Sequence, residues 1–282
     1  MKLRINPASQ GFAWARQGWL VCARQPMGYA GLVGMVIAGA LLMAGLPLIG
    51  PILVVALMPL AWMGFMLATR RVMLKERIMP GVLVEAVRAP DSPRAAFARL
   101  GAAYVAGTFL VMLLAQLLGP GAEALAEALE KAQDADEVMA DPRVLQDMAW
   151  RLGLTWPLSL LFWHTPALTL WGRMPLGKAL FFSAVASWRN LGAFVVFGAT
   201  WLLAMIGLAV LTRVVQQAIP LPALANMLTF AGVLWLVSCF YASLYFSVVD
   251  CFEGAQQEGT SAPGEPDHTD QNDRGDQSDP ST

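Results

Sequence analysis

Residues 25–69 contain no Asp, Glu, Lys, Arg or His, and a turn-like segment, Leu-Pro-Leu-Ile-Gly-Pro at 46–51, divides this stretch in two. A helix needs about 20 apolar residues to cross the ~30 Å hydrocarbon layer of a membrane. It can do so because a helix satisfies its backbone hydrogen bonds internally where no water is available. The stretch therefore predicts two membrane-spanning helices joined by a short turn.

Four further segments have the same apolar character. Charged residues make up 14% of the chain, well below the ~25% that is usual for soluble proteins. Pro220 and Pro222 mark a helix boundary before the last apolar window. The predicted spans are 27–46, 49–69, 101–119, 152–172, 192–212 and 223–249. The predicted fold class is all-α: a polytopic transmembrane bundle of six helices over residues 1–252.

The distribution of Lys and Arg predicts the orientation of these spans, because basic flanking segments stay in the cytoplasm during insertion. Most basic residues precede the first span or lie in the second-to-third and fourth-to-fifth connections. The segments on the opposite side hold only Lys131, Arg143, Arg151 and Arg213. Both termini are therefore predicted to be cytoplasmic.

From Glu253 onward the chain is dominated by Gly, Ser, Asp, Gln, Pro and Thr. Such a segment cannot bury enough apolar surface to offset the entropy lost on ordering. Residues 253–282 are therefore predicted to form a disordered acidic cytoplasmic tail. The tail could bind a protein partner, although a solubilising role is the favoured interpretation.

The basic connection 70–100 places apolar side chains at helical spacing over 82–87, after Pro80. We interpret it as a short amphipathic hairpin at the cytoplasmic lipid surface. Its Lys and Arg side chains could attract anionic lipid by about 1 kcal/mol each. A connection that only fixes the orientation of the protein explains the same charges and is favoured.

The opposite connection, 121–150, predicts a small helical hairpin with scattered acidic side chains. Asp141-Pro142 is typical of the cap and first turn of a helix. The acids match no calcium-loop pattern, so a solvated face is favoured over cation binding.

Two parts of the chain resemble each other and suggest a parallel internal repeat. Leu-Gly-Ala occurs at 100–102 and again at 191–193, and a mid-span proline precedes each copy, at Pro59 and Pro166. Many transporters are built from repeats, with sites at the repeat interface. Short apolar segments also match by chance, so both interpretations stay open.

His164 is the one ionisable side chain inside a predicted span, and Thr165 and Pro166 follow it. An ionisable group in hydrocarbon is a candidate functional site, because keeping it there is costly. A proton relay or a ligand contact is one hypothesis. A neutral histidine that bonds to local backbone is favoured, since no second acid or histidine lies within the predicted spans.

The sequence contains no Gly-x-Ser-x-Gly, no His-Glu-x-x-His and no phosphate-binding loop. Its three cysteines lack metal-ligand spacing. A net charge of −1 gives no indication of nucleic-acid binding. We therefore expect no enzymatic activity, no cofactor, no metal and no nucleic-acid partner.

Several short motifs occur together in this chain. They are Trp14, Gly18 and Trp19, Ile49-Gly50-Pro51, Met58-Pro59-Leu60, Phe162-Trp163, Pro166, Trp171, Met174-Pro175, the Lys-Ala-Leu-Phe-Phe-Ser run at 178–183, Trp188-Arg189-Asn190 and Ala193-Phe194. On these residues the chain resembles a family of proteobacterial multi-pass inner-membrane proteins, over about residues 11 to 250. The family has no established activity, so the resemblance implies a location and supplies no catalytic residues.

The leading hypothesis is a non-enzymatic inner-membrane component that interacts with partners or organises the membrane. The alternative is a small secondary transporter or permease-like protein with a site near His164. A water-accessible cavity that reaches His164 would favour transport, whereas a closed bundle would favour the first hypothesis.

Overall fold

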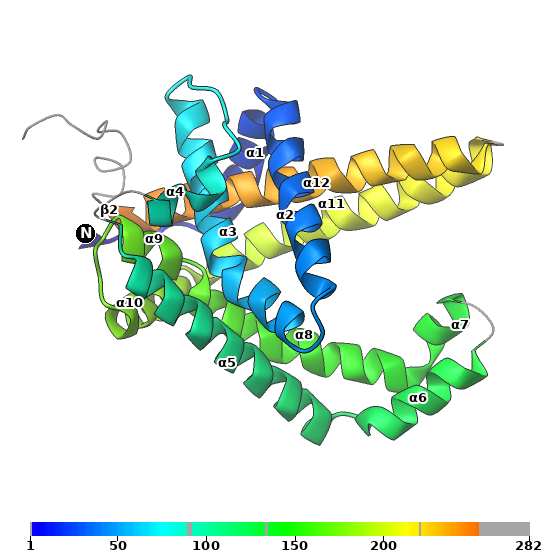
Figure 1. The fold of residues 1–282 in the computed structure, drawn as a ribbon. Coiled ribbons are helices and arrows are strands. Elements are labelled where there is room, and N and C mark those ends of the chain that lie inside the picture. The colour runs from blue at the N-terminus through cyan, green and yellow to red at the C-terminus, as the bar shows by residue number, and fades with distance from the viewer. Residues whose placement is uncertain (1, 89–91, 133–134, 220, 254–282) are drawn as a thin grey trace, which may run out of the picture.

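The computed structural model describes residues 2–88, 92–132, 135–219 and 221–253, and these are almost entirely helical (Figure 1). The long helices are α2 (Pro26–Ala44), α3 (Ile49–Met73), α5 (Arg94–Leu118), α8 (Pro142–Phe162), α11 (Leu191–Ala218) and α12 (Pro222–Cys251). The shorter ones are α1 (Gln10–Cys22), α4 (Val82–Arg88), α6 (Gly121–Lys131), α7 (Ala135–Ala140), α9 (Thr165–Leu170) and α10 (Leu176–Arg189). Two short strands, β1 (Lys2–Leu3) and β2 (Phe252–Glu253), lie at the two ends of the described chain.

Five of the described helices are long and apolar enough to cross a membrane: α2, α3, α5, α11 and α12. They coincide with five of the six predicted spans. The prediction of a helical, multi-pass membrane protein is therefore confirmed, since charge-free stretches of this length have few other stable structures.

The predicted fourth span, 152–172, is not one helix. Helix α8 ends at Phe162, Trp163 and His164 lie between the helices, and α9 begins at Thr165. Pro166 explains the break, because proline lacks an N–H and its ring collides with the carbonyl four residues earlier, at Phe162. The prediction of a continuous helix here is wrong, and a sixth membrane crossing stays a prediction.

The start of α8 agrees with the prediction made from the sequence. Asp141 caps the helix by accepting a hydrogen bond from the backbone N–H of Arg143, at 2.8 Å, and Pro142 occupies the first turn. The predicted helix start is therefore confirmed. Because α8 begins this early, it carries Asp147 and Arg151 on its first turns, joined by an ion pair of 2.6 Å.

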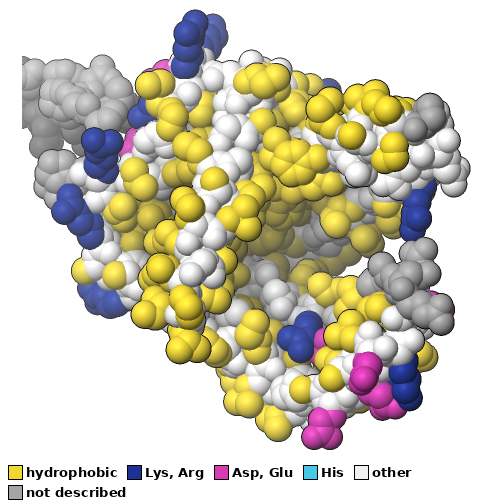
Figure 2. All heavy atoms as spheres, turned by 45° about the vertical axis from the view of Figure 1, so that its right-hand side comes forward, with side chains coloured by type: hydrophobic (Ala, Val, Ile, Leu, Met, Phe, Trp, Pro, Cys, Tyr) yellow, Lys and Arg dark blue, Asp and Glu magenta, His cyan; other side chains and the backbone are white. Residues whose placement is uncertain are grey.

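The long helices pack together at one end of the molecule and diverge toward the other (Figure 1). We call the packed region, which contains α1, α9, α10, β1, β2 and the adjoining ends of α3, α11 and α12, the closed end. We call the diverging parts of α5, α8, α11 and α12, together with α6 and α7, the open end. Figure 2 shows a hollow at the open end whose walls are largely hydrophobic side chains. The buried core therefore lies mostly at the closed end.

Helix α1 joins the closed end together by packing between α11 and α12. A methyl group added at Gly18 would overlap Ser243 of α12, and one added at Gly11 would overlap the backbone of Ala193 in α11. These two glycines therefore permit the close approach of three helices. No helix was predicted over residues 10–22, because this segment is too short and too polar to cross a membrane.

The two ends of the described chain lie side by side. Strands β1 and β2 pair antiparallel, with Lys2 opposite Glu253 and Leu3 opposite Phe252. Glu253, predicted to begin the tail, is thus part of a strand. The remainder of the predicted tail, 254–282, lies outside the described residues. The cytoplasmic location of both ends stays a prediction.

Helix α4 occupies the basic connection where a helix was predicted. Its apolar residues Val82 and Ala86 are buried, and it packs on α3, where Gly64 leaves room for Leu83. Its apolar face therefore covers protein. The interpretation of this connection as a hairpin at the lipid surface stays a prediction, since Val84 on the same helix is exposed.

The proposed repeat stays a prediction. A long helix, a short helix and a long helix follow one another in α3–α4–α5, and α8 to α11 has the same order with α9 inserted. The copies differ at their prolines. Helix α3 continues through Pro59, whereas the helix is interrupted just before Pro166, between α8 and α9.

Candidate functional site

The candidate residues His164, Thr165 and Pro166 lie at the break between α8 and α9. His164 is the residue before α9, and its carbonyl accepts the backbone N–H of Leu168 at 3.0 Å. The Thr165 hydroxyl donates to the Leu161 carbonyl at 2.9 Å. The Thr165 hydrogen bond satisfies a carbonyl in the last turn of α8, which the break leaves without a helical partner.

His164 is completely enclosed, with 0% of its surface exposed. Its backbone N–H donates to the Ser183 hydroxyl at 3.1 Å. Its imidazole meets the rings of Phe194 and Phe252 edge to face, with centroids 5.7 and 5.3 Å away. The backbones of Ser183 and Ser247 lie close to the ring, but neither ring nitrogen has a hydrogen-bond partner among the described residues. The site is therefore a sealed aromatic pocket.

Serine side chains bind the broken segment to its neighbours. Ser183 and Ser187, one turn apart on α10, both donate to the Leu160 carbonyl at 3.1 Å. The Trp163 indole N–H donates to the Ser247 hydroxyl of α12 at 2.9 Å. These serines were not predicted as site residues, although the spacing of Ser183 and Ser187 puts them on one helix face and could have indicated a polar contact.

A second polar group fastens the chain ends to the helices. The Asn190 amide oxygen accepts the Asn6 backbone N–H at 2.7 Å. The Asp250 carboxylate accepts from the Gln10 amide at 2.6 Å and from the Trp14 indole at 2.8 Å. Buried polar groups of this kind need partners, and here each partner belongs to another element. The cluster therefore fastens α1, and the segment before it that contains Asn6, to α12 and to the start of α11.

The described His, Cys, Asp and Glu side chains of the closed end do not form a metal-binding cluster. Among the residues that the structure describes, no three His, Cys, Asp or Glu side chains gather closely enough to hold a metal ion. The His164 ring nitrogens have no hydrogen-bond partner in the described part of the chain. The arrangement is suited to fixing helices in place.

Two cavities lie away from His164. A cavity of about 150 Å³ adjoins Trp163 on the side facing Trp62 and Tyr241, and His164 is not part of its wall. A larger cavity of about 670 Å³ lies between α11 and α12 toward the open end. It contains no His164 atom in its wall either, so the larger volume and the buried histidine are separate features of the molecule.

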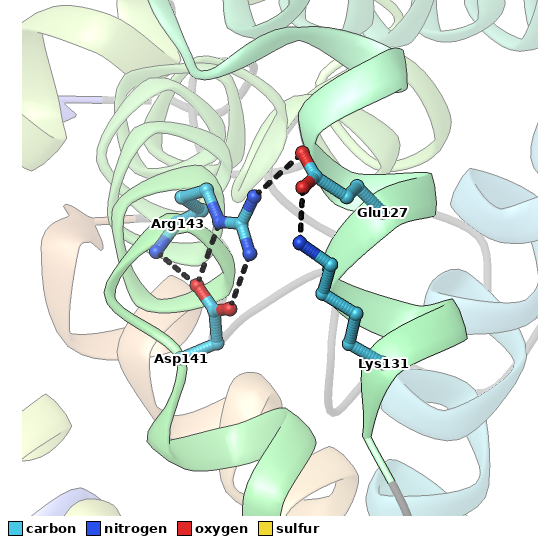
Figure 3. A network of polar contacts seen from close by, with 4 residues as sticks. All are labelled: Glu127, Lys131, Asp141 and Arg143. Carbon is cyan, nitrogen blue, oxygen red and sulfur yellow. Dashed lines mark hydrogen bonds and ion pairs between the residues drawn. The ribbon is translucent and has the colours of Figure 1, made fainter.

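An ion-pair network links α6 to the start of α8 at the open end (Figure 3). Arg143 bonds to Asp141 at 2.9 Å and to Glu127 at 3.1 Å, and Lys131 pairs with Glu127 as well. Hydrogen bonds from Lys131 and Arg143 lower the pKa of the Glu127 and Asp141 carboxyls, respectively. Because all four side chains contact water, the network contributes little stability. It fixes the position of α6.

The sequence was compared with known proteins. It is 30% identical, over 271 residues, to a protein of Burkholderia thailandensis named "Probable inner membrane protein"; the match covers 92% of this chain and 96% of the relative. No family model matches the chain. No solved structure matches it. A match of this extent establishes that the two proteins belong to one family. It agrees with the five apolar helices and with the resemblance found in the sequence. The chain is a multi-pass inner-membrane protein and belongs to the family of its Burkholderia relative.

Proposed function

We propose that this protein is a non-enzymatic inner-membrane component that organises the lipid and protein around it. The observation that carries the proposal is the contrast along α12. Residues 242–249 are all buried, whereas most of residues 221–233 are exposed although they are mainly apolar. Exposed apolar surface of this extent marks a membrane or protein contact. The open end therefore presents an apolar hollow that the surrounding bilayer fills.

The polar interior supports the same proposal. Asn190, Asp250 and Ser183 each bond to a different structural element, so their hydrogen bonds connect helices. A substrate pathway would instead need polar groups that face a water-filled opening. Polar groups that form hydrogen bonds within the protein, rather than facing a pathway, are expected in a protein that acts through its shape and surface.

At the predicted cytoplasmic face, anionic lipid is the proposed partner of the basic connection between α3 and α5. Lys75, Arg77 and Arg88 are exposed there. Because the apolar face of α4 covers α3, the attraction would be electrostatic, at about 1 kcal/mol for each basic side chain near the surface. A protein partner could bind the segment 254–282.

One observation favours the alternative, a secondary transporter with a site near His164. Helices that are interrupted within the membrane often form the sites of transporters. Here the helix is interrupted at Trp163 and His164, between α8 and α9. Against it stands the enclosure of the imidazole, which no surface water reaches. The two functions differ in what they require of His164.

Replacement of His164 distinguishes the membrane-organising function from the transporter function. The full-length protein would be reconstituted in vesicles of phosphatidylcholine and phosphatidylglycerol that contain a fluorescent reporter of lipid order. We expect the wild type to change lipid order in proportion to its amount, and His164→Phe to do the same. Thr169→Val is the matched control, since this buried hydroxyl in α9 has no partner among the described side chains.

The same variants would be expressed in a strain lacking the protein. Equal restoration of membrane order by wild type and His164→Phe supports the proposal. Loss of restoration in a folded His164→Phe, with Thr169→Val intact, would favour transport, and His164→Gln covers the case in which the larger ring does not fit. A wild type without any effect on lipid order would contradict the proposed function.

A further inference from the structure

Two cysteines meet where α1 crosses α12 at the closed end. Cys22 is the last residue of α1, Cys239 lies within α12, and both side chains are 0% exposed. Their thiols are close enough to share a hydrogen bond. Both are free cysteines. The fold therefore places two thiols from distant parts of the sequence side by side in an enclosed space.

The backbones of α1 and α12 approach each other closely at this crossing. A Cβ atom added at Gly18 would lie 2.8 Å from the carbonyl oxygen of Cys239 and 2.5 Å from the Cβ of Ser243. Cys22 follows Gly18 by one helical turn, so both lie on the side of α1 that meets α12. A disulfide needs Cα atoms about 4.4–6.8 Å apart, and helices reach such separations where small residues let their backbones touch. The crossing therefore suits a covalent link between the two sulfurs.

Contacts on either side of the crossing hold the two helices in register. Trp19 of α1 meets Trp235 of α12 edge to face, with ring centroids 5.6 Å apart. Beyond the cysteines, the Trp14 indole donates to the Asp250 carboxylate at 2.8 Å. A slide of α1 along α12 would break both contacts. The two thiols therefore stay together in the folded protein.

We propose that Cys22 and Cys239 form a modification site at which hydrogen peroxide produces an intramolecular disulfide. First, one sulfur attacks a peroxide oxygen, the O–O bond breaks, and the leaving hydroxide takes the thiol proton to become water, which leaves a sulfenic acid. The second sulfur then attacks the sulfenic sulfur, the S–S bond forms, and the hydroxyl leaves with the second thiol proton as another water. Two electrons pass from the sulfurs to the peroxide.

The enclosure of the pair decides which reagents reach it. Hydrogen peroxide is small and uncharged, so a local opening at the end of α1 is enough to admit it. Glutathione is large and charged, so it reaches the sulfurs only when the helices separate. Buried thiols react slowly, and we therefore expect slow oxidation that the glutathione pool reverses poorly. The disulfide joins α1 to α12 and stabilises the closed end.

The test treats the full-length protein in inner-membrane vesicles with hydrogen peroxide until Met27, an 84% exposed side chain, is oxidised. The protein is then unfolded in detergent, its remaining thiols are alkylated with a maleimide, and its peptides are identified by mass spectrometry. We expect the Cys22 and Cys239 peptides to be linked, and Cys251 to be alkylated. Because the link restrains the unfolded chain, the melting temperature should rise by about 5 °C.

Two variants provide matched controls. Cys22→Ala removes one member of the pair and should lose both the linked peptides and the rise in melting temperature. Cys251→Ala removes the third buried cysteine, which lies at the far end of α12, and should keep both. The peptide analysis of the wild type does not depend on how either variant folds.

The possible outcomes all bear on the pair. Oxidation of Met27 with Cys22 and Cys239 still alkylated would overturn the proposal. Sulfinic or sulfonic acid at either cysteine without a link would also overturn it, because the second thiol would then be out of reach. A disulfide that includes Cys251 or joins two copies of the protein, or an equal rise in melting temperature in Cys22→Ala, would overturn it as well.

Discussion

The closed and open ends of this protein are built from the same helices and from similarly apolar sequence, yet they have different neighbours. At the closed end α12 contacts α1, α3 and β2, and small residues such as Ser243 and Ser247 let other helices approach or accept hydrogen bonds from them. At the open end the side chains of α12 face outward. Apolar character thus predicts that a helix avoids water, whereas small and polar residues decide where protein replaces lipid as its neighbour.

The largest expected effect comes from disrupting the packing of α1 against α12 at the closed end. Gly18→Leu places a side chain where Ser243 of α12 already lies. Overpacking of this kind costs about 3 kcal/mol when the helices cannot separate freely. We expect a much lower melting temperature in detergent and loss of much of the folded protein.

Gly31→Leu is the matched control for that change. Nothing lies within 4 Å of a Cβ atom at Gly31, on the exposed side of α2. The two variants make the same Gly→Leu substitution within a helix, one at a close helix contact and one facing open space, so their difference reports on packing. Equal melting temperatures would mean that α1 does not pack between α11 and α12.

A smaller effect is expected from the polar contacts of the closed end. Asp250→Ala leaves the indole N–H of Trp14 without its acceptor, and Trp14 is 0% exposed. A buried unpaired donor costs about 1–3 kcal/mol. Thermal or denaturant unfolding would measure the loss.

The double variant Asp250→Ala with Trp14→Phe completes the test. Removing both partners should cost less than the sum of the single changes, because the buried indole donor is then no longer present without an acceptor. Strict additivity would show that the hydrogen bond contributes nothing to the closed end.

The smallest effect concerns pH at the open end. The pKa values of Glu127 and Asp141 are lowered from 4.5 and 3.8, so their ion pairs stabilise the folded form above those values. As pH falls through the lowered pKa values, the carboxylates gain protons and the stabilisation is lost. A spin label at Leu129→Cys, an exposed position of α6, should become more mobile as the pH falls through these lowered pKa values.

Arg143→Gln provides the control for this titration. The substitution removes the ion pair from α8 to Glu127, so the label should already be mobile at neutral pH and change little on acidification. A label whose mobility rises equally on acidification in both proteins would show that Arg143 does not fix α6.

The sequence predicted the membrane helices well and their interruption poorly. Charge-free stretches sufficed for α2, α3, α5, α11 and α12 because span length is set by the bilayer. The break before Thr165 could have been expected from Pro166, but membrane helices often tolerate proline, and α3 does so at Pro59. Local sequence therefore cannot tell whether a helix continues through a proline or is interrupted by it.

The candidate site was predicted only in part. His164, Thr165 and Pro166 were identified because an ionisable residue beside a proline stands out in an apolar span. Their partners were missed, since Ser183 and Ser247 look unremarkable in their own helices. The bond between Asn6 and Asn190 joins residues 184 positions apart, and no local pattern encodes such a pairing.

Carbene labelling of the native protein from within the bilayer tests the contrast between the two ends most directly. A photoactivatable diazirine on a lipid chain would be irradiated in inner-membrane vesicles, and modified residues would be mapped by mass spectrometry. We predict heavy labelling of residues 221–233 of α12 and almost none of residues 242–249. Equal labelling along the whole of α12 would contradict a lipid-filled open end joined to a closed, protein-packed one.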